Sequence, residues 1–189
     1  MAILGIDELL KRVKTDKLVE GLGDREVNNP EGVGVDLRLG AVHKIIEGGA
    51  YIEVDGKSGL GKRKGVKTEL IAEFKPEQDS QQEIIIKSGD YFLVTTHETI
   101  NTPDDLMPMV YPRSSLFRAG LLQLNTKTDP GYKGKLTMGL TNLSQFEVKL
   151  QMGARICNIV FFEIKGKTVK YRGQHQGGRV SPDKEEQQV

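Results

Sequence analysis

A series of short runs of β-branched and aromatic residues, separated by turn signals at close intervals, restricts the fold of this chain more than any other feature. Such runs favour strands, and many short strands joined by turns are typical of antiparallel sandwiches and barrels. We expect strands at Val42–Ile46, Tyr51–Val54, Glu69–Phe74, Glu83–Ile86, Tyr91–Thr96, Leu121–Leu124, Lys135–Asn142, Phe146–Leu150 and Arg155–Ile164. The fold is therefore expected to be all-β.

A short amphipathic helix is expected ahead of the strands. The apolar residues Ile6, Leu9, Leu10 and Val13 recur at the spacing of one helix face, and Asp7 is the expected N-cap. The sequence therefore predicts a helix over residues 6–13.

Length and composition favour one domain with its own core, because 189 residues can bury enough apolar surface. We expect a single β-barrel domain over residues 1–172. Residues 173–189 begin rich in glycine and end charged, which predicts a flexible tail that can act as a lid over an active site. Residues 56–67, rich in glycine and lysine, are expected to form a mobile basic loop.

Charge and cysteine content argue against several classes of function. With 27 basic and 26 acidic residues, the chain lacks the charge expected of a nucleic-acid partner. The lone Cys157 cannot form a disulfide or a cysteine zinc site within one chain, so a buried role is expected. No apolar run reaches membrane-spanning length and no signal peptide is recognisable at the start, so a cytoplasmic protein is expected.

The stretch YPRSSLFRAGL at residues 111–121 places two hydroxyls and two guanidinium groups around one short helical turn. Ser114 or Ser115 can cap this turn, and free backbone N–H groups at a helix start attract anions. Arg113 and Arg118 would add charge-assisted donors for phosphoryl oxygens. On spacing alone, an ordinary capped surface helix explains the pattern equally well.

A second motif, Asp129-Pro130-Gly131-Tyr132, follows this stretch after eight residues. Proline fixes φ at the second position of a turn and glycine takes a positive φ at the third, so the carboxylate of Asp129 is held at a rigid bend. A fixed carboxylate can orient a water molecule. Because turn-forming aspartates are common in β proteins, the motif alone favours a structural role.

Two further motifs frame these, GVDLRLG at residues 34–40 and GARICNI at residues 153–159. In this order, and with the glycine-rich tail, the four motifs resemble the superfamily of dUTPases and dCTP deaminases along essentially the whole chain. The resemblance implies a distorted β-barrel of the dUTPase-like (β-clip) type, with a short N-terminal helix and one short internal helix. It also implies a homotrimer with active sites between subunits. Asp36 is expected to brace Arg113 or Arg155 through an ion pair.

Carried over by motif, the resemblance implies a site for dUTP or a related pyrimidine deoxynucleoside triphosphate. The side chains implied to bind nucleotide and phosphate are Arg113, Ser114, Ser115, Arg118, Asn158, Gln176 and Arg179. Those implied to contact base and sugar are Thr128, Asp129, Tyr132, Leu136 and Tyr171.

The resemblance also implies roles for two of these residues. Asp129 matches the dUTPase acid that positions water for attack on the α-phosphorus, and Tyr132 matches the aromatic residue that packs against deoxyribose. Mg²⁺ would be held by the phosphates and water rather than by protein ligands, which fits its preference for octahedral oxygen ligands.

One position separates the two branches of the superfamily. Deamination at C4 of cytosine needs a group that takes a proton from water and delivers protons to the departing ammonia, and dCTP deaminases use a glutamate in a Leu-Glu pair for this. The corresponding pair here is Met138-Gly139, and glycine cannot move a proton. A glycine inside a strand more often marks the close approach of another group. The zinc deaminase signature is absent as well.

The leading hypothesis is therefore a dUTPase that converts dUTP and water to dUMP and diphosphate, with Asp129 as its catalytic residue. Two alternatives stay open. The N-terminal helix and the tail GQHQGGR at residues 173–179 resemble the deaminase branch, so the chain could be a dCTP deaminase that forms dUTP, or a bifunctional one that forms dUMP. It could also be a non-catalytic sensor that binds deoxynucleotides.

Overall fold

The computed structural model describes residues 2–54 and 61–187. The helices are α1 (Ile6–Asp16), α2 (Asp24–Asn28) and α3 (Ser114–Arg118). The strands are β1 (Val19–Glu20), β2 (Val35–Glu47), β3 (Tyr51–Ile52), β4 (Lys62–Lys64), β5 (Lys67–Glu73), β6 (Glu83–Ile86), β7 (Tyr91–Thr96), β8 (Thr99–Asn101), β9 (Leu106–Pro112), β10 (Leu121–Leu124), β11 (Lys133–Gly134), β12 (Thr137–Asn142), β13 (Val148–Gln151), β14 (Arg155–Glu163) and β15 (Glu186–Gln187). The expectation of a mainly β fold with few short helices is confirmed.

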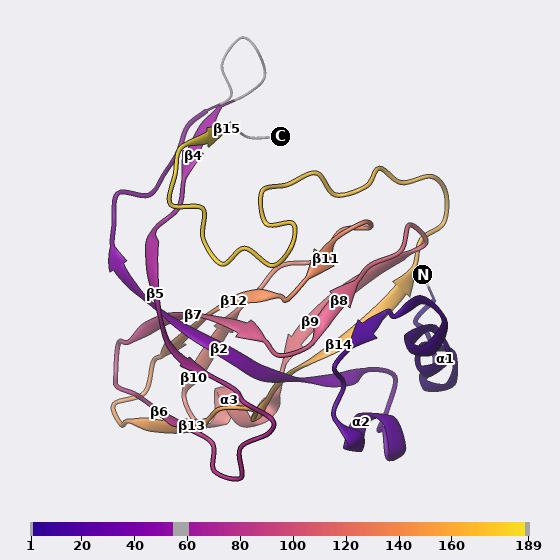
Figure 1. Cartoon of the computed structure of the whole chain (residues 1–189), viewed down its shortest axis with the longest axis horizontal. Coiled ribbons are helices and arrows are strands. Elements are labelled where there is room, and N and C mark those ends of the chain that lie inside the picture. Colours follow the sequence, from indigo (N-terminus) through magenta and orange to yellow (C-terminus); the bar gives the residue numbers. More distant parts are fainter. Residues whose placement is uncertain (1, 55–60, 188–189) are drawn as a thin grey trace.

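One antiparallel sheet forms most of the barrel wall, in the strand order β10-β12-β7-β2-β14-β9, with β5 paired to β2 as well. Smaller sheets of the order β1-β8-β11, β13-β6 and β15-β4-β3 complete the described structure. Figure 1 shows the main sheet curling into a nearly closed antiparallel barrel, with α1 and α2 on its outside and with β4 and β15 projecting away from it. The two edge strands of the main sheet, β9 and β10, flank the short helix α3.

Strand β2 passes from one side of the barrel to the other by changing partners. Its first residues, up to Arg38, pair with β14, whereas Leu39 and the residues after it pair with β7. The register shifts between Leu39 and Ala41, and a side chain at Gly40 would collide with the backbone of Thr96. A glycine at this bulge therefore lets the two strands approach closely enough for the sheet to curl.

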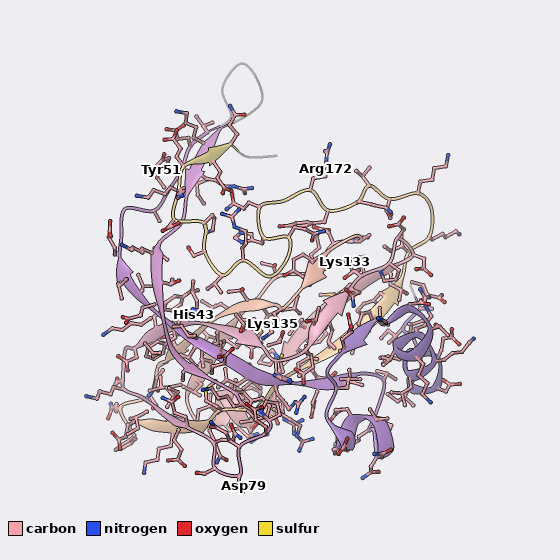
Figure 2. All side chains as sticks on the ribbon, viewed as in Figure 1. His43, Tyr51, Asp79, Lys133, Lys135 and Arg172 are labelled. Atoms are coloured by element: carbon pink, nitrogen blue, oxygen red, sulfur yellow. The ribbon has the colours of Figure 1, made fainter. Side chains whose placement is uncertain are left out.

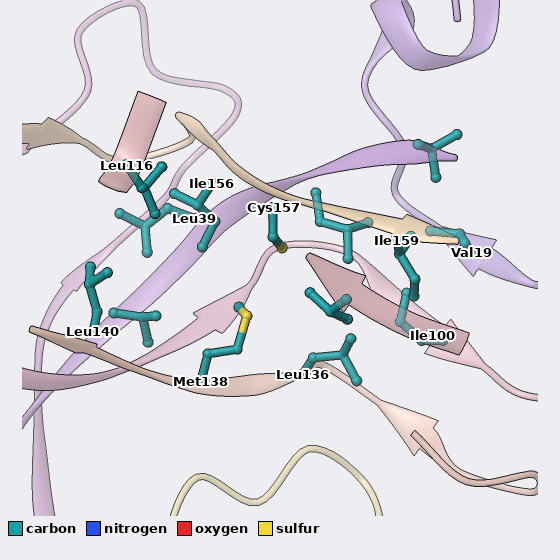
Figure 3. Close-up of a cluster of buried hydrophobic side chains, with 14 of the residues drawn as sticks. Val19, Leu39, Ile100, Leu116, Leu136, Met138, Leu140, Ile156, Cys157 and Ile159 are labelled. Carbon is teal, nitrogen blue, oxygen red and sulfur yellow. The ribbon is translucent and has the colours of Figure 1, made fainter. Parts of the chain in front are cut away.

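The core fills the inside of the barrel with inward-facing residues of the main sheet (Figure 3). Leu39 of β2, Met138 and Leu140 of β12, and Ile159 of β14 are all buried there. Cys157 is completely buried, as expected from its apolar surroundings, and burial raises the pKa of its thiol to about 12. A thiol of this kind stays protonated and acts as a small hydrophobic side chain.

Two predicted helix caps are wrong. The N-cap of α1 is Gly5 in an extended conformation, so Asp7 lies within the first turn. There its negative charge interacts favourably with the positive end of the helix dipole. The N-cap of α3 is Arg113, which is extended and makes no side-chain capping bond. Ser114 and Ser115 are therefore the first residues inside α3 and do not cap it.

Several strands were missed or placed too late in the chain. Strand β2 begins at Val35 rather than Val42, and β9 was not expected at all. The sequence of β9 contains Pro108 and Pro112, which lack the N–H that a central strand needs, but β9 is the edge of the sheet. Of the basic loop expected at residues 56–67, the part up to residue 60 lies outside the described residues and the rest contains β4.

The chain after β14 runs back across the barrel without a helix or strand until it reaches β15 (Figure 1). There Glu186 and Gln187 pair with β4. The amide of Gly65 donates to the carbonyl oxygen of Pro182 at 2.6 Å, and the hydroxyl of Ser181 donates to the carbonyl of Val66 at 2.6 Å. The final residues are thus attached to a hairpin that follows β2.

We predict that Phe161→Ala lowers the free energy of unfolding by about 3–5 kcal/mol, because it leaves a cavity in the centre of the core. Phe161 is fully buried on β14, whereas Phe146 is 78% exposed. The matched control Phe146→Ala should therefore change the free energy by no more than about 0.5 kcal/mol. Urea denaturation of both variants measures the difference, and equal losses would contradict this description of the core.

Candidate active site

A cavity of ≈ 340 Å³ lies between the turn after β10, the start of β12 and the C-terminal segment. Residues 125–129 form one wall, and residues 136–138 form another. Tyr171, His175 and Val180 of the C-terminal segment also line the cavity. This cavity brings together all five residues that the sequence implied for base and sugar, which are Thr128, Asp129, Tyr132, Leu136 and Tyr171.

Tyr132 forms a rigid aromatic wall of this cavity. Its hydroxyl donates to the carbonyl oxygen of Lys135 at 2.6 Å, and its ring meets that of Tyr171 edge to face, with 5.5 Å between centroids. Burial, with a smaller contribution from Tyr171, raises the pKa of Tyr132 to about 12, so the phenol is neutral. A fixed, uncharged ring of this kind can pack against a sugar.

Asp129 lies at the rim of the cavity on the predicted turn. Gly131 has φ +80°, as the turn requires, and the amide of Tyr132 donates to the carbonyl oxygen of Asp129 at 3.2 Å. The Asp129 carboxylate pairs with the ammonium group of Lys127. Of the described residues that line the cavity, Asp129 is the one carboxylic acid.

The residues implied for phosphate binding around α3 lie apart from this cavity. Helix α3 and the turn at residues 125–129 are at opposite ends of β10, whose four residues span about 13 Å. Ser114, Ser115 and Arg118 are exposed on α3, and the guanidinium of Arg118 lies over the ring of Phe117. Within one chain, these groups do not face the same space as Asp129.

The carboxylate of Asp36 binds the other two residues implied for phosphate near α3, Arg113 and Asn158. Its buried carboxylate accepts hydrogen bonds from Arg113, from Arg155 at 3.1 Å and from the amide of Asn158 at 3.0 Å. The expectation that Asp36 braces these arginines is confirmed. The carboxylate thereby fixes three donor groups from the region of β9 and from β14.

A second buried acid, Glu26, extends this network, which we call the arginine cluster: Arg25, Arg113 and Arg155 around Asp36 and Glu26. Glu26 accepts from Arg25 at 2.8 Å and from the backbone amide of Asp36 at 2.9 Å. Burial, together with the charges of Arg155 and Arg25, lowers the pKa of Arg113. Glu31 also pairs with Arg25 at 3.0 Å, so three anions balance the three cations, and the arginine side chains are 33–39% exposed. The cluster can therefore present N–H donors to an anion.

Gly139 lies on β12 next to the cavity wall, at the position where the resemblance implies a glutamate in deaminases. A Cβ atom added there would lie 2.5 Å from Oη of Tyr91. The expectation that this glycine marks the close approach of another group is confirmed, and the group is the phenol of Tyr91.

Residues 3–164 match the family model described as dCTP deaminase-like. The chain belongs to the dCTP deaminase-like family. A "dCTP deaminase, dUMP-forming" of Dictyoglomus thermophilum is 33% identical over 178 residues, which cover 86% of this chain and 80% of the relative. A "dCTP deaminase" of Haloarcula marismortui is 32% identical over 197 residues, and this alignment covers 97% of each of the two chains.

A solved structure supports the fold of this family member. The crystal structure of 2′-deoxycytidine 5′-triphosphate deaminase from Agrobacterium tumefaciens aligns with a TM-score of 0.60 at 18% identity. The alignment covers 86% of this chain but only 48% of that chain, so the present chain spans about half its length. The expected dUTPase-like barrel is thereby confirmed.

The C-terminal segment of this family member is attached to the Asp129 turn by Gln176. The Gln176 amide donates to the carbonyl of Gly131 at 3.0 Å and accepts from the amide of Lys133 at 3.0 Å. Arg179 pairs with Glu186 at 2.7 Å. Both residues implied for phosphate in the tail thus bond within the protein. Figure 2 shows Lys133, Lys135 and Arg172 on the side of the barrel where this segment passes.

Several lining residues were not identified from the sequence. Asn125 and Lys127 line the cavity and lie within four residues before the Asp-Pro-Gly-Tyr motif, and this closeness is the signal that could have identified them, whereas Thr137 falls within the hairpin from Asp129 to Met138 that the resemblance implies to contact base and sugar. His175 and Val180 carried no such signal, because only the path of the C-terminal segment brings them to the cavity. Within residues 2–54 and 61–187, no three His, Cys, Asp or Glu side chains are grouped closely enough to hold a metal ion, and no helix is long and apolar enough to span a membrane.

We predict that Asp36→Asn lowers the free energy of unfolding by about 3–5 kcal/mol, because it leaves buried guanidinium groups without their counter-charge. The control Asp104→Asn removes a surface carboxylate that pairs with Lys170 at 3.3 Å, which should cost about 1 kcal/mol or less. Thermal denaturation of both variants measures this. A fully stable Asp36→Asn variant would show that the arginine cluster does not depend on Asp36.

We predict that Gln176→Ala loosens the C-terminal segment, because it removes two hydrogen bonds that together contribute about 2 kcal/mol. The amide of Gly177, which donates to the carbonyl of Lys133 at 2.8 Å, should then exchange its hydrogen about 30-fold faster. Gln151→Ala, on the exposed side of the β13–β6 pair, is the control and should leave this amide unchanged. Unchanged exchange in both variants would mean that Gln176 is not a tether.

Proposed function

We propose that this chain binds a pyrimidine deoxynucleoside triphosphate in the cavity and hydrolyses dUTP to dUMP and diphosphate. The observation that carries the proposal is that the described lining of the cavity holds one carboxylic acid, Asp129, while position 139 holds none. Hydrolysis at phosphorus needs a positioned water and charge stabilisation, which one acid and nearby cations can provide. Such a role in deoxynucleotide metabolism agrees with a cytoplasmic enzyme.

In this proposal, Asp129 accepts a hydrogen bond from the attacking water and orients its oxygen toward the α-phosphorus. The water oxygen forms the new bond to the α-phosphorus while Asp129 takes its proton, the bond from the α-phosphorus to the bridging oxygen breaks, and diphosphate leaves with that oxygen. Lys127 keeps the carboxylate near the rim through its ion pair. Tyr132 packs against the deoxyribose, where its ring leaves no room for a 2′-hydroxyl. Residues 173–189 act as a lid that excludes bulk water.

Mg²⁺ fits this arrangement as an ion that arrives with the nucleotide. A single carboxylate at the rim is a hard oxygen donor, but one donor is too few for a protein-held site, so phosphate oxygens and water would hold the ion. When bound, Mg²⁺ neutralises part of the phosphate charge.

The phosphate groups are proposed to be held by a second copy of the chain. Helix α3 is separated from the Asp129 turn by the length of β10, about 13 Å, and no residue of the arginine cluster is among those that line the cavity. Exposed apolar residues on the outer face of the sheet, Leu122 and Leu124 at 41% and 48% exposure, offer a surface that a neighbour can cover. In a homotrimer, Arg113, Ser114 and Ser115 of one copy would complete the cavity of the next.

The second candidate function is dCTP deamination, and the names of the matched relatives favour it over plain dUTP hydrolysis. Forming dUMP from dCTP requires the loss of both the amino group and diphosphate, so a family member without the deaminating acid would retain only the second step. Carboxylate chemistry at C4 would then need an acid from outside the described cavity lining.

Asp129→Asn is predicted to lower kcat for diphosphate release from dUTP by at least about 100-fold and to leave the Kd for dUTP within about threefold. The amide keeps the size of the carboxylate but cannot accept the water proton. Asp79→Asn is the control, because Asp79 lies at the opposite end of the molecule from the tail (Figure 2). Diphosphate release with Mg²⁺ and isothermal titration measure the two quantities.

The same preparations decide between the candidates when dCTP replaces dUTP. Ammonia released from dCTP at an enzymatic rate would establish deamination in place of our proposal. Tight nucleotide binding without diphosphate or ammonia would instead identify a sensor.

A further inference from the structure

The backbone conformation at position 139 does not require a glycine. Gly139 is not among the glycines with positive φ, and it pairs with Leu93 on β7 and Leu124 on β10 in regular antiparallel register. Any L-residue can adopt such a strand conformation. The reason for a glycine at this position therefore lies in what surrounds it.

Tyr91 supplies that reason. The three atoms nearest to a Cβ built on Gly139 all belong to this side chain: Oη at 2.5 Å, Cζ at 3.1 Å and Cε2 at 3.2 Å. Tyr91 pairs with Thr141 on β12, and its ring reaches diagonally across the face to the residue two positions earlier. The contact is thus between one glycine and one phenol, and no backbone atom takes part in it.

This face of β12 continues into the cavity wall. Side chains on a strand alternate between its two faces, so Thr137 and position 139 share a face about 7 Å apart. Thr137 lines the cavity. Leu136 and Met138, on the other face of the strand, also line the cavity, so both faces of β12 border it and position 139 follows directly after its last lining residue on this strand.

We propose that Tyr91 is a specificity-determining residue, because a side chain at position 139 must displace its phenol and the contact thereby disfavours a deaminating acid there. This inference rests on the proposed function, since it assumes that the cavity binds the nucleotide. The first atoms of a glutamate at position 139 would occupy the space that Tyr91 Oη now fills. The pair of Tyr91 and Gly139, rather than Gly139 alone, keeps a proton carrier away from the base.

The exclusion matters because deamination needs a carboxylate at that point. Water adds through its oxygen to C4 of cytosine, a carboxylate takes the water proton, and the same group delivers a proton to N4 as the C4–N4 bond breaks and ammonia leaves. A phenol that packs over a glycine provides no carboxylate for this exchange. Removing the phenol and adding the carboxylate are therefore both required.

Tyr91 can be replaced without opening the core. Its side chain lies on the outer face of the sheet, where the residue is 41% exposed. The neighbouring core residues Met138 and Leu140 point to the opposite face of β12. Tyr91→Ala should therefore yield a folded protein on which position 139 can be tested.

The first test is a double-mutant cycle read by thermal denaturation. In the Tyr91→Ala background, Gly139→Ala should raise Tm by about 2 °C, because alanine lowers the backbone entropy of the unfolded chain. In the wild-type background this gain should be lost or reversed, because the new Cβ meets the phenol. Tyr91→Phe removes only Oη, so it should give an intermediate result.

Two matched controls isolate the pair. Gly48 also has an ordinary φ and has nothing within 4 Å of an added Cβ, so Gly48→Ala should have the same effect with Tyr91 or Ala at position 91. Tyr111 is 46% exposed on β9, and Tyr111→Ala should leave the effect of Gly139→Ala unchanged. Equal effects of Gly139→Ala in the Tyr91 and Tyr91→Ala backgrounds would overturn the steric part of the proposal.

The second test measures ammonia released from dCTP by Gly139→Glu and by the double variant Gly139→Glu/Tyr91→Ala. The double variant should release ammonia at least about tenfold faster than either single variant. A Gly139→Glu variant that is stable and as active as the double variant would show that Tyr91 is no obstacle. A folded double variant that binds dCTP and releases no ammonia would refute the role of Tyr91 in specificity.

Failure of this inference and failure of the proposed function give different results. If the wild-type protein releases no diphosphate from dUTP, the proposed function fails, whereas the coupling in Tm between positions 91 and 139 is unaffected. If diphosphate is released and the coupling is absent, only the inference about Tyr91 fails.

Discussion

The buried carboxylate of Asp36 is the interaction on which the rest of this structure depends. It lies on β2 and accepts hydrogen bonds from Arg113, which follows β9, and from Arg155 and Asn158 on β14, so it connects three neighbouring strands of the main sheet. A buried carboxylate is tolerated only when such donors surround it. The same contacts that close the barrel therefore also fix the orientation of the guanidinium groups at its surface.

This arrangement separates the two halves of the proposed site. The strands that hold Asp36 end beside α3, whereas the turn that holds Asp129 lies at the far end of β10. Neither half can be moved toward the other without breaking the sheet, because both are attached to its strands. The proposed homotrimer would resolve this separation, because the arginine cluster of one copy could then serve the cavity of the next.

Local chemistry decided which features could be predicted from the sequence. The turn at Asp129 was predictable because proline and glycine act over a few residues, and the bracing of Arg113 was predictable from the complementary charges of two motifs, although Asp36 lies 77 positions away. Strand β9 was not, because its prolines exclude it from a sheet interior and only the assembled sheet makes it an edge. The serine caps failed because Arg113 already takes the extended conformation at the start of α3.

At position 139, two residues on different strands together decide which space is open beside the cavity. The glycine could be found in the sequence, but its partner could not, since Tyr91 lies on another strand and only the register of β7 with β12 brings the two together. The contact lies on the outer face of the sheet, where Tyr91 is 41% exposed, so a change at either residue disturbs neither the core nor the Asp129 turn. The three atoms nearest to a Cβ at position 139 all belong to the end of this one side chain, so its position sets the space that is open there. The contacts that hold the fold, such as those of Asp36, are thus separate from the contact between positions 91 and 139, and the two can change independently.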